Sequence, residues 1–73
     1  MNDTEILVWL AEHLWRFRID SSIADMLYHI NNGNIQEARF QTDKKLSRVE
    51  MLRACVTIAV NRETENKNPK QKI

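Results

Sequence analysis

The segment from Glu5 to Ile19 carries apolar side chains on more sides than a chain of 73 residues can cover. Its spacing predicts an amphipathic helix whose core face has apolar residues three and four positions apart. The members of this face are Leu7, Leu10, Leu14 and Phe17. A second apolar stripe lies almost opposite and consists of Val8, Trp15 and Ile19, while Trp9 lies apart from both stripes.

Large side chains off the main core face indicate a surface that a partner protein covers. Tryptophan is enriched at the energetic centres of interfaces, whereas charged residues are more common at their rims. We therefore predict one partner-binding surface, with Glu12 and Arg16 as its polar rim. Its members are Val8, Trp9, Glu12, Trp15, Arg16 and Ile19. The alternative is that this helix is central in the protein and is covered by two other helices.

A chain of this length forms one domain at most. The stability that its small core provides is marginal unless a covalent cross-link, a metal or a partner adds to it. The single cysteine, Cys55, excludes an internal disulfide and is typical of a small buried residue in a reducing compartment. A metal site would need His13, His29 and Cys55 to converge with a carboxylate, and none of the usual ligand spacings is present. We expect no catalytic site, metal or cofactor, since no Gly-rich oxyanion turn or third orienting group accompanies these residues.

The net charge of +1 argues against nucleic-acid binding that depends on phosphate neutralisation. The apolar run from Ile6 to Ala11 ends at Glu12 and is too short for a signal peptide or a membrane span. We therefore expect a cytoplasmic protein whose partners are proteins, with neither a membrane nor a nucleic acid among them.

The chain has few helix-breaking residues, with one glycine and one proline, and this favours an all-helical fold. Asn2 and Glu5 have the spacing of a capping box, which predicts a first helix from about Asp3 to Arg18. The same spacing at Ser22 and Asp25 predicts a second helix, which Gly33 ends. The apolar face of this second helix consists of Ile23, Met26, Leu27 and Ile30.

A long third helix is predicted from Ile35 to about Arg62 because its apolar residues keep one helical phase. A capping box at Ser47 and Glu50 leaves open a break between Thr42 and Ser47. The predicted fold class is therefore all-α: a small helical hairpin with an extra N-terminal helix. Residues 1–62 form the single domain, and the polar residues 63–73 form a disordered C-terminal tail.

Five basic residues gather in the region of this predicted long helix, namely Arg39, Lys44, Lys45, Arg48 and Arg53. A helix-turn-helix protein would carry them on a short recognition helix after a tight turn. Asp43 and Glu50 interrupt the cluster. A solvated helix face therefore explains it better than a DNA-binding site does.

The predicted layout resembles the YscE family of cochaperones of bacterial type III secretion, which includes the PscE and SsaE types. The resemblance covers about Ser22 to Arg62 and rests on the turn at Gly33-Asn34 and on a pattern in the long helix. That pattern consists of Phe40-Gln41, Leu46, Val49-Glu50, Val56 and Ile58. Membership would imply a short cytosolic helical hairpin that binds a chaperone of tetratricopeptide type, the pair keeping a needle subunit soluble before export.

The residues and the resemblance agree on a small non-enzymatic protein with an apolar face for a protein partner. Our hypothesis from the sequence is a cochaperone of this kind, associated with virulence, which forms homodimers when its partner is absent. The alternative is a small regulatory protein that binds a transcription factor, a polymerase subunit or another protein. A helical DNA-binding protein is the third hypothesis.

Overall fold

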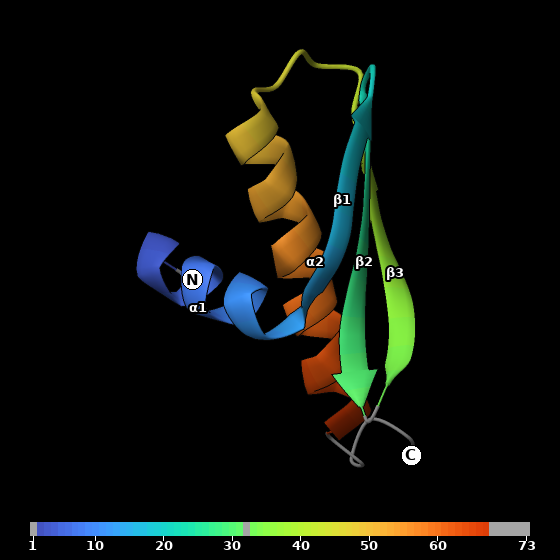
Figure 1. Ribbon diagram of the computed structural model, residues 1–73. Helices are drawn as coiled ribbons and strands as arrows, with labels where there is room; N and C mark the ends of the chain where they lie inside the picture. Colours follow the sequence, from blue (N-terminus) through green and yellow to red (C-terminus); the bar gives the residue numbers. More distant parts are fainter. Residues whose placement is uncertain (1, 32, 68–73) are drawn as a thin grey trace.

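The computed structural model describes residues 2–31 and 33–67, which form two layers, an antiparallel sheet and two helices on one of its faces (Figure 1). The helices and strands in chain order are α1 (Asp3–His13), β1 (Leu14–Asp20), β2 (Ile23–Asn31), β3 (Asn34–Gln41) and α2 (Arg48–Lys67). The sheet has the order β1-β2-β3. The prediction of an all-α helical hairpin is therefore wrong, and the class is α+β.

The first correction concerns the segment from Leu14 to Asp20, which forms β1 and does not continue α1. From Arg16 to Asp20 the chain alternates strictly between charged and apolar residues, which is the period of a strand with one buried face. Phe17 and Ile19 are half-buried and pack against the core, while the charged residues between them are exposed. The same apolar residues also fit a helical spacing, and that fit misled the prediction.

The second correction concerns the predicted second helix, which is strand β2. Ala24, Met26 and Tyr28 are fully buried on the helix-covered face, and Asp25 and Leu27 alternate with them. The apparent capping box that begins at Ser22 therefore has no helix to cap. β2 is the central strand and pairs with both neighbours. Its period-two pattern arises because the helices cover only one face of the antiparallel sheet.

Gly33 marks a hairpin turn and not the C-terminus of a helix. Two residues separate Asn31 at the end of β2 from Asn34 at the start of β3, and Gly33 has a φ of 88°. The sequence of that connection is Asn-Gly, the dipeptide that two-residue hairpins favour because positive φ is needed there. Gly33 does separate two regular elements, but the helices predicted on either side of it are strands.

The predicted third helix divides into β3 and α2, with an irregular connection between them. The capping box at its centre is confirmed: Ser47 N–H donates to Glu50 Oε1 at 3.0 Å, and Glu50 N–H donates to Ser47 Oγ at 3.2 Å. The hydrogen bonds from Ser47 lower the pKa of Glu50. A single continuous helix from Ile35 to Arg62 is therefore wrong, and the break near Thr42 to Ser47 is real.

The ends of the helices also differ from the prediction. The box of Asn2 and Glu5 caps α1 as expected, but the helix ends at His13 and not at Arg18. α2 continues to Lys67, so the first five residues of the predicted tail are helical. The remainder of that tail, residues 68–73, lies outside the described residues. Neither helix of the described part is long and apolar enough to cross a membrane.

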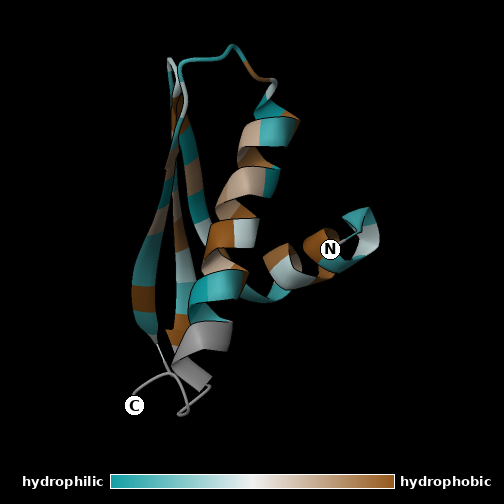
Figure 2. Cartoon of the chain, turned by 180° about the vertical axis from the view of Figure 1, so that it is seen from behind, coloured by the Kyte–Doolittle hydropathy of each residue, from teal (hydrophilic) through white to brown (hydrophobic). Residues whose placement is uncertain are grey.

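The core lies between α2 and the sheet, with α1 closing one end. Figure 2 shows both helices on the same side of the sheet, and apolar and polar bands alternate along α2 as expected of a helix with one buried face. The buried residues of α2 are Met51, Cys55, Val56 and Ala59. α1 contributes Ile6 and Trp9, whose ring lies 5.3 Å from the Tyr28 ring, centroid to centroid.

Replacing Gly33 tests the hairpin turn. A Cβ added there would meet nothing within 4 Å, so the cost of Gly33→Val comes from the backbone alone. Because positive φ is unfavourable for a β-branched residue, we expect a loss of about 1–2 kcal/mol in the free energy of unfolding, measured by urea titration. Gly33→Asn is the control and should lose less, since asparagine tolerates this conformation. Equal losses for both variants would contradict the assignment.

Tyr28 offers a second test, because its hydroxyl is buried without a hydrogen-bond partner among the described residues. Removing an unsatisfied polar atom while keeping the ring leaves the packing in place. We expect Tyr28→Phe to be neutral or to raise the free energy of unfolding by about 1 kcal/mol. A clear loss of stability would show that the hydroxyl has a partner.

Candidate protein-binding groove

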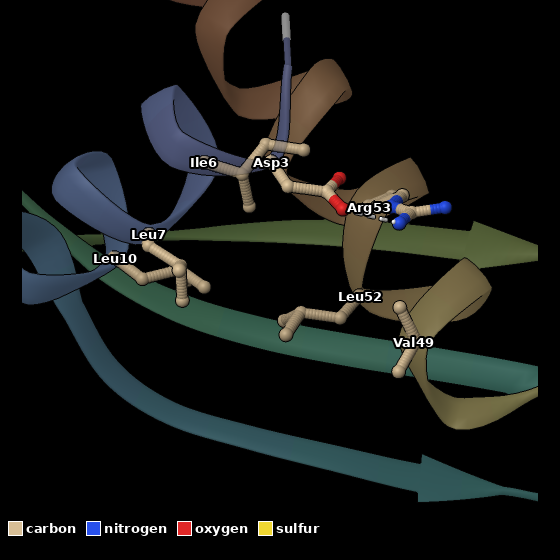
Figure 3. Close-up of a pocket in the computed structure, with 7 residues that line it drawn as sticks. All are labelled: Asp3, Ile6, Leu7, Leu10, Val49, Leu52 and Arg53. Atoms are coloured by element: carbon tan, nitrogen blue, oxygen red, sulfur yellow. Dashed lines mark hydrogen bonds and ion pairs between the residues drawn. The ribbon is translucent and has the colours of Figure 1, made fainter.

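An apolar groove of about 220 Å³ runs between α1 and α2 (Figure 3). Aliphatic side chains from both helices form its walls, and one exposed ion pair lies beside them. The residues that line it are Asp3, Ile6, Leu7, Leu10, Val49, Leu52 and Arg53. The groove exists because α1 crosses α2 and leaves the first turns of α2 uncovered.

Leu7 and Val49 are the most exposed large apolar residues of the described chain, at 66% and 57%. One comes from each helix, and both line the groove. Single exposed aliphatic residues are ordinary on protein surfaces, but apolar residues that converge on a concave site are typical of a binding site. Burying two such side chains would contribute about 1.5–3 kcal/mol each.

The ion pair beside the groove joins the two helices. Arg53 Nη2 lies 2.9 Å from Asp3 Oδ2, and both side chains are largely exposed. A pair of this kind contributes little stability, about 0–1 kcal/mol. Because the two charges neutralise each other, the groove carries no net charge at this position.

The structure does not bring the predicted partner-binding residues to one surface. Trp9 is 8% exposed, stacks on His13 at 4.5 Å between ring centroids and belongs to the core, so the expectation that it is exposed is wrong. Three of the six, the exposed Val8 and Glu12 together with Trp9, do line one shallow hollow of about 300 Å³ on α1, separate from the groove. Ile19 is half-buried on the helix-covered side of the sheet.

Trp15 and Arg16 lie on a β-bulge. The register of β1 against β2 shifts between Leu14 and Arg16, so that two residues of β1 oppose Leu27 of β2. Trp15 is 53% exposed, as predicted, and the Arg16 guanidinium carbon lies 5.4 Å from its ring centroid. Arg16 is therefore a neighbour of Trp15, but Glu12 belongs to α1 and does not complete the predicted rim.

The residues that form the groove were assigned to the core by the sequence argument. Leu7 and Leu10 lie on the predicted core face of the first helix, and Val49 and Leu52 are among the apolar residues that share one helical phase in the predicted long helix. Their helical spacing was correct, but the strands between the helices determine how the helices cross. The groove therefore had no signal in the sequence beyond an excess of apolar residues.

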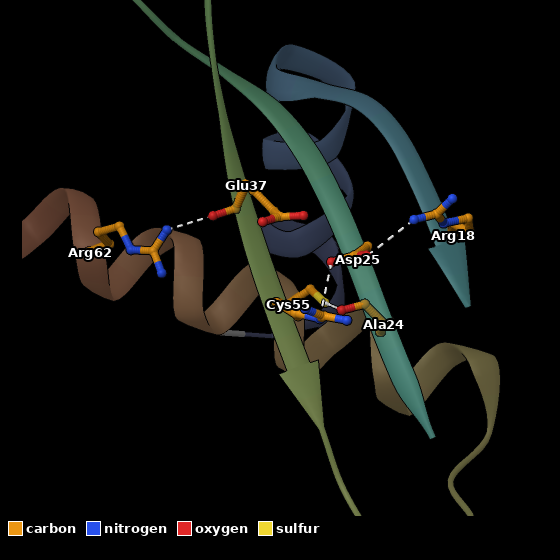
Figure 4. A network of polar contacts seen from close by, with 7 residues as sticks. Arg18, Ala24, Asp25, Glu37, Cys55 and Arg62 are labelled. Carbon is orange, nitrogen blue, oxygen red and sulfur yellow. Dashed lines mark hydrogen bonds and ion pairs between the residues drawn. The ribbon is translucent and has the colours of Figure 1, made fainter. Parts of the chain in front are cut away.

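The cluster of basic residues is dispersed by the fold. Arg39 lies on β3, 3.6 Å from Asp25 Oδ1, and Arg53 pairs with Asp3 on another side of the molecule. Arg18 Nη2 donates to the other Asp25 oxygen at 3.3 Å (Figure 4). Two members of the cluster, Arg39 and Arg53, are therefore paired with acidic side chains in different parts of the molecule, and Arg18 from outside the cluster shares Asp25 with Arg39.

Cys55 and the histidines do not form a chemical site in the described part of the chain. No group of three or more potential metal ligands occurs among the described residues. Cys55 is fully buried, and its thiol lies 3.6 Å from the Ala24 carbonyl oxygen. Burial, assisted by the Asp25 carboxylate, raises the pKa of the Cys55 thiol to about 11. Cys55 thus packs as a small apolar residue.

Comparison with known protein families, with curated proteins and with solved structures finds no match to this chain.

The two tryptophans should differ in fluorescence quenching. In the single-tryptophan variants, acrylamide should quench Trp15 strongly in Trp9→Phe and Trp9 weakly in Trp15→Phe, because only Trp15 is widely exposed. Unfolding in urea should make the two quenching constants equal. Equal constants in the folded protein would contradict the position of Trp9 in the core.

The reactivity of Cys55 tests its burial. At pH 8 a thiol with a pKa near 11 has about 100-fold less thiolate than an ordinary cysteine, and the thiolate is the reactive form. We expect alkylation by iodoacetamide to be at least that much slower in the folded chain than in urea. Rapid alkylation of the native protein would contradict the packing role.

Proposed function

We propose that this chain is a small non-enzymatic regulatory protein of the cytoplasm that binds a helical segment of a partner protein in the groove between α1 and α2. The observation that carries the proposal is the convergence of the exposed Leu7 and Val49 on one concave apolar site. The alternative named from the sequence, a regulator that binds a transcription factor or another protein, is thus the function that we retain.

The size and chemistry of the groove favour protein side chains over a cofactor. Its volume of about 220 Å³ lies below the range of about 300–1,000 Å³ that is typical of small-molecule sites. Its walls are aliphatic, and the only charges beside it, Asp3 and Arg53, neutralise each other. An amphipathic helix that inserts aliphatic residues between two helices matches these properties.

The helical hairpin on which the cochaperone hypothesis depended is not present in the described residues. The implied helical hairpin spanned about Ser22 to Arg62, and residues 23–31 and 34–41 of that range are strands. A role in type III secretion remains an untested prediction from the sequence. We do not include it in the proposed function.

Charge substitutions on α1 test the proposal. Leu7→Glu introduces a carboxylate into the groove, whereas Val8→Glu, its neighbour and matched control, introduces the same charge outside it. Both positions are more than half exposed and both substitutions suit a helix, so the fold should persist, as circular dichroism will show. Partners should be identified by quantitative mass spectrometry after capture from cells of the native source.

For a recombinant partner identified in this way, we expect Leu7→Glu and Val49→Glu to weaken binding at least about tenfold, because each leaves a charge in an apolar contact. Val8→Glu should change the dissociation constant by less than about threefold. A partner whose affinity depends on Val8 and not on Leu7 would move the binding site to the hollow on α1. A partner indifferent to all three substitutions would overturn the proposed site.

A further inference from the structure

We propose that a second copy of this chain pairs with the free edge of β1, in an antiparallel register centred on Arg18, to form a six-stranded sheet. This inference goes beyond the groove, since it concerns the sheet edge and requires no other partner. The two edges of the sheet differ in how far their outward backbone groups already have hydrogen-bond partners.

The β3 edge is covered in part by α2. Arg62 Nη1 donates to the Glu37 carbonyl oxygen at 2.6 Å, so one outward acceptor of this edge is already used (Figure 4). α2 also packs mainly on β3 and β2. A strand added at this edge would have to displace the Arg62 contact.

The β1 edge carries backbone groups without such a partner. Thr42 N–H donates to the Ser22 carbonyl at 3.1 Å, which shows that even-numbered residues along β2 hydrogen-bond to β3. Odd-numbered residues of β2 therefore form their backbone hydrogen bonds with even-numbered residues of β1. Phe17 and Ile19 consequently direct their N–H and C=O groups away from the sheet. Within the described residues, no hydrogen bond satisfies these four groups.

The side chains along β1 are self-complementary in one register. With Arg18 opposite Arg18 of the second copy, Phe17 lies opposite Ile19, and Arg16 lies opposite Asp20, each pair occurring twice by symmetry. The hydrogen-bonding groups of Phe17 and Ile19 then face each other, as an antiparallel ladder requires. The half-buried Phe17 and Ile19 side chains also become covered.

The neighbouring registers are less favourable. A register centred on Phe17 places Arg16 opposite Arg18 twice, which opposes like charges. A register centred on Ile19 also pairs opposite charges, Arg18 with Asp20 twice, and sets Ile19 against its copy, but it places Phe17 opposite Ser21, beyond the end of β1, so that Phe17 has no apolar partner. The chosen register has one like-charge pair, Arg18 with its copy, but each guanidinium is already held by Asp25.

Charged residues also protect sheet edges from unwanted pairing, and Arg16 and Arg18 would serve that purpose if the chain were monomeric. The position of Asp20 distinguishes the two roles, because a protective edge needs no opposite charge at the matching position. The two-fold axis lies perpendicular to the sheet, so the dimer presents both grooves on the same face.

A disulfide at the two-fold axis tests the register. Arg18 and its copy form a non-hydrogen-bonded pair, whose Cα atoms lie about 4.5 Å apart, within the range of a disulfide. We expect Arg18→Cys to form a covalent dimer when oxidised glutathione accepts the two electrons of the thiol pair. Arg39→Cys, a similarly exposed position on the same sheet face but at the opposite edge, is the control and should stay monomeric. The buried Cys55 does not interfere.

Charge reversal tests the ion pairs in solution. Asp20→Arg should weaken the dimer at least about tenfold by sedimentation equilibrium, because Arg16 then faces an arginine. Adding Arg16→Asp to that variant should restore the dissociation constant to within about threefold of the original. Leu7→Glu should still dimerise, so failure of the groove proposal remains distinguishable from failure of this one.

A wild-type chain that stays monomeric up to about 1 mM overturns the inference. Equal cross-linking of Arg18→Cys and Arg39→Cys overturns it as well. A monomer whose β1 edge instead binds a peptide copying residues 14–20 would show that the edge accepts strands but not a second copy, and would also overturn it.

Discussion

The close contact between α2 and the middle of the sheet is the interaction on which the rest of the structure depends. Ala24 of β2 and Ala38 of β3 are fully buried beneath Cys55 and Ala59 of α2. Small residues on both sides let the helix lie near the strands, and the larger Met26 and Tyr28, which follow Ala24 on the same face of β2, are also fully buried. A larger side chain at any of these four positions would force the layers apart, at a cost of about 1–3 kcal/mol.

This contact also determines which surfaces stay open. α2 lies mainly over β3 and β2, so β1 is covered less completely and its inward side chains remain half-buried. α1 reaches α2 through Ile6 and closes only one end of this space. The groove and the free β1 edge are therefore both consequences of one helix covering two strands of three.

The N-terminal ends of the two helices could be predicted from the sequence, but their C-terminal ends and the strands were missed. The capping boxes at Asn2 and at Ser47 were right because they rest on local hydrogen bonds that need no tertiary structure. The identical spacing at Ser22 and Asp25 carried no such meaning, because these residues lead into and lie on strand β2. The Asn-Gly dipeptide at 32–33 and the alternation from Arg16 to Asp20 were the signals that would have identified the sheet.

The strands were hard to recognise because their apolar residues also satisfy a helical spacing. β2 contains Ala24, Met26 and Leu27, which favour helices in isolation, and tertiary packing overrides that preference. The candidate site was less predictable still. Exposure at Leu7 and Val49 depends on the crossing of α1 and α2, which the intervening sheet sets and no local pattern encodes.

Nuclear Overhauser effects between α-protons test the central claim, the three-stranded sheet, most directly. Non-hydrogen-bonded pairs in antiparallel strands have closely approaching α-protons, and the register assigns Phe17 with Met26 and Asp25 with Arg39 to such pairs. The account predicts strong α-proton contacts for both pairs. Contacts between residues three apart along Ile23–Asn31, with both cross-strand signals absent, would show a helix there and contradict the account.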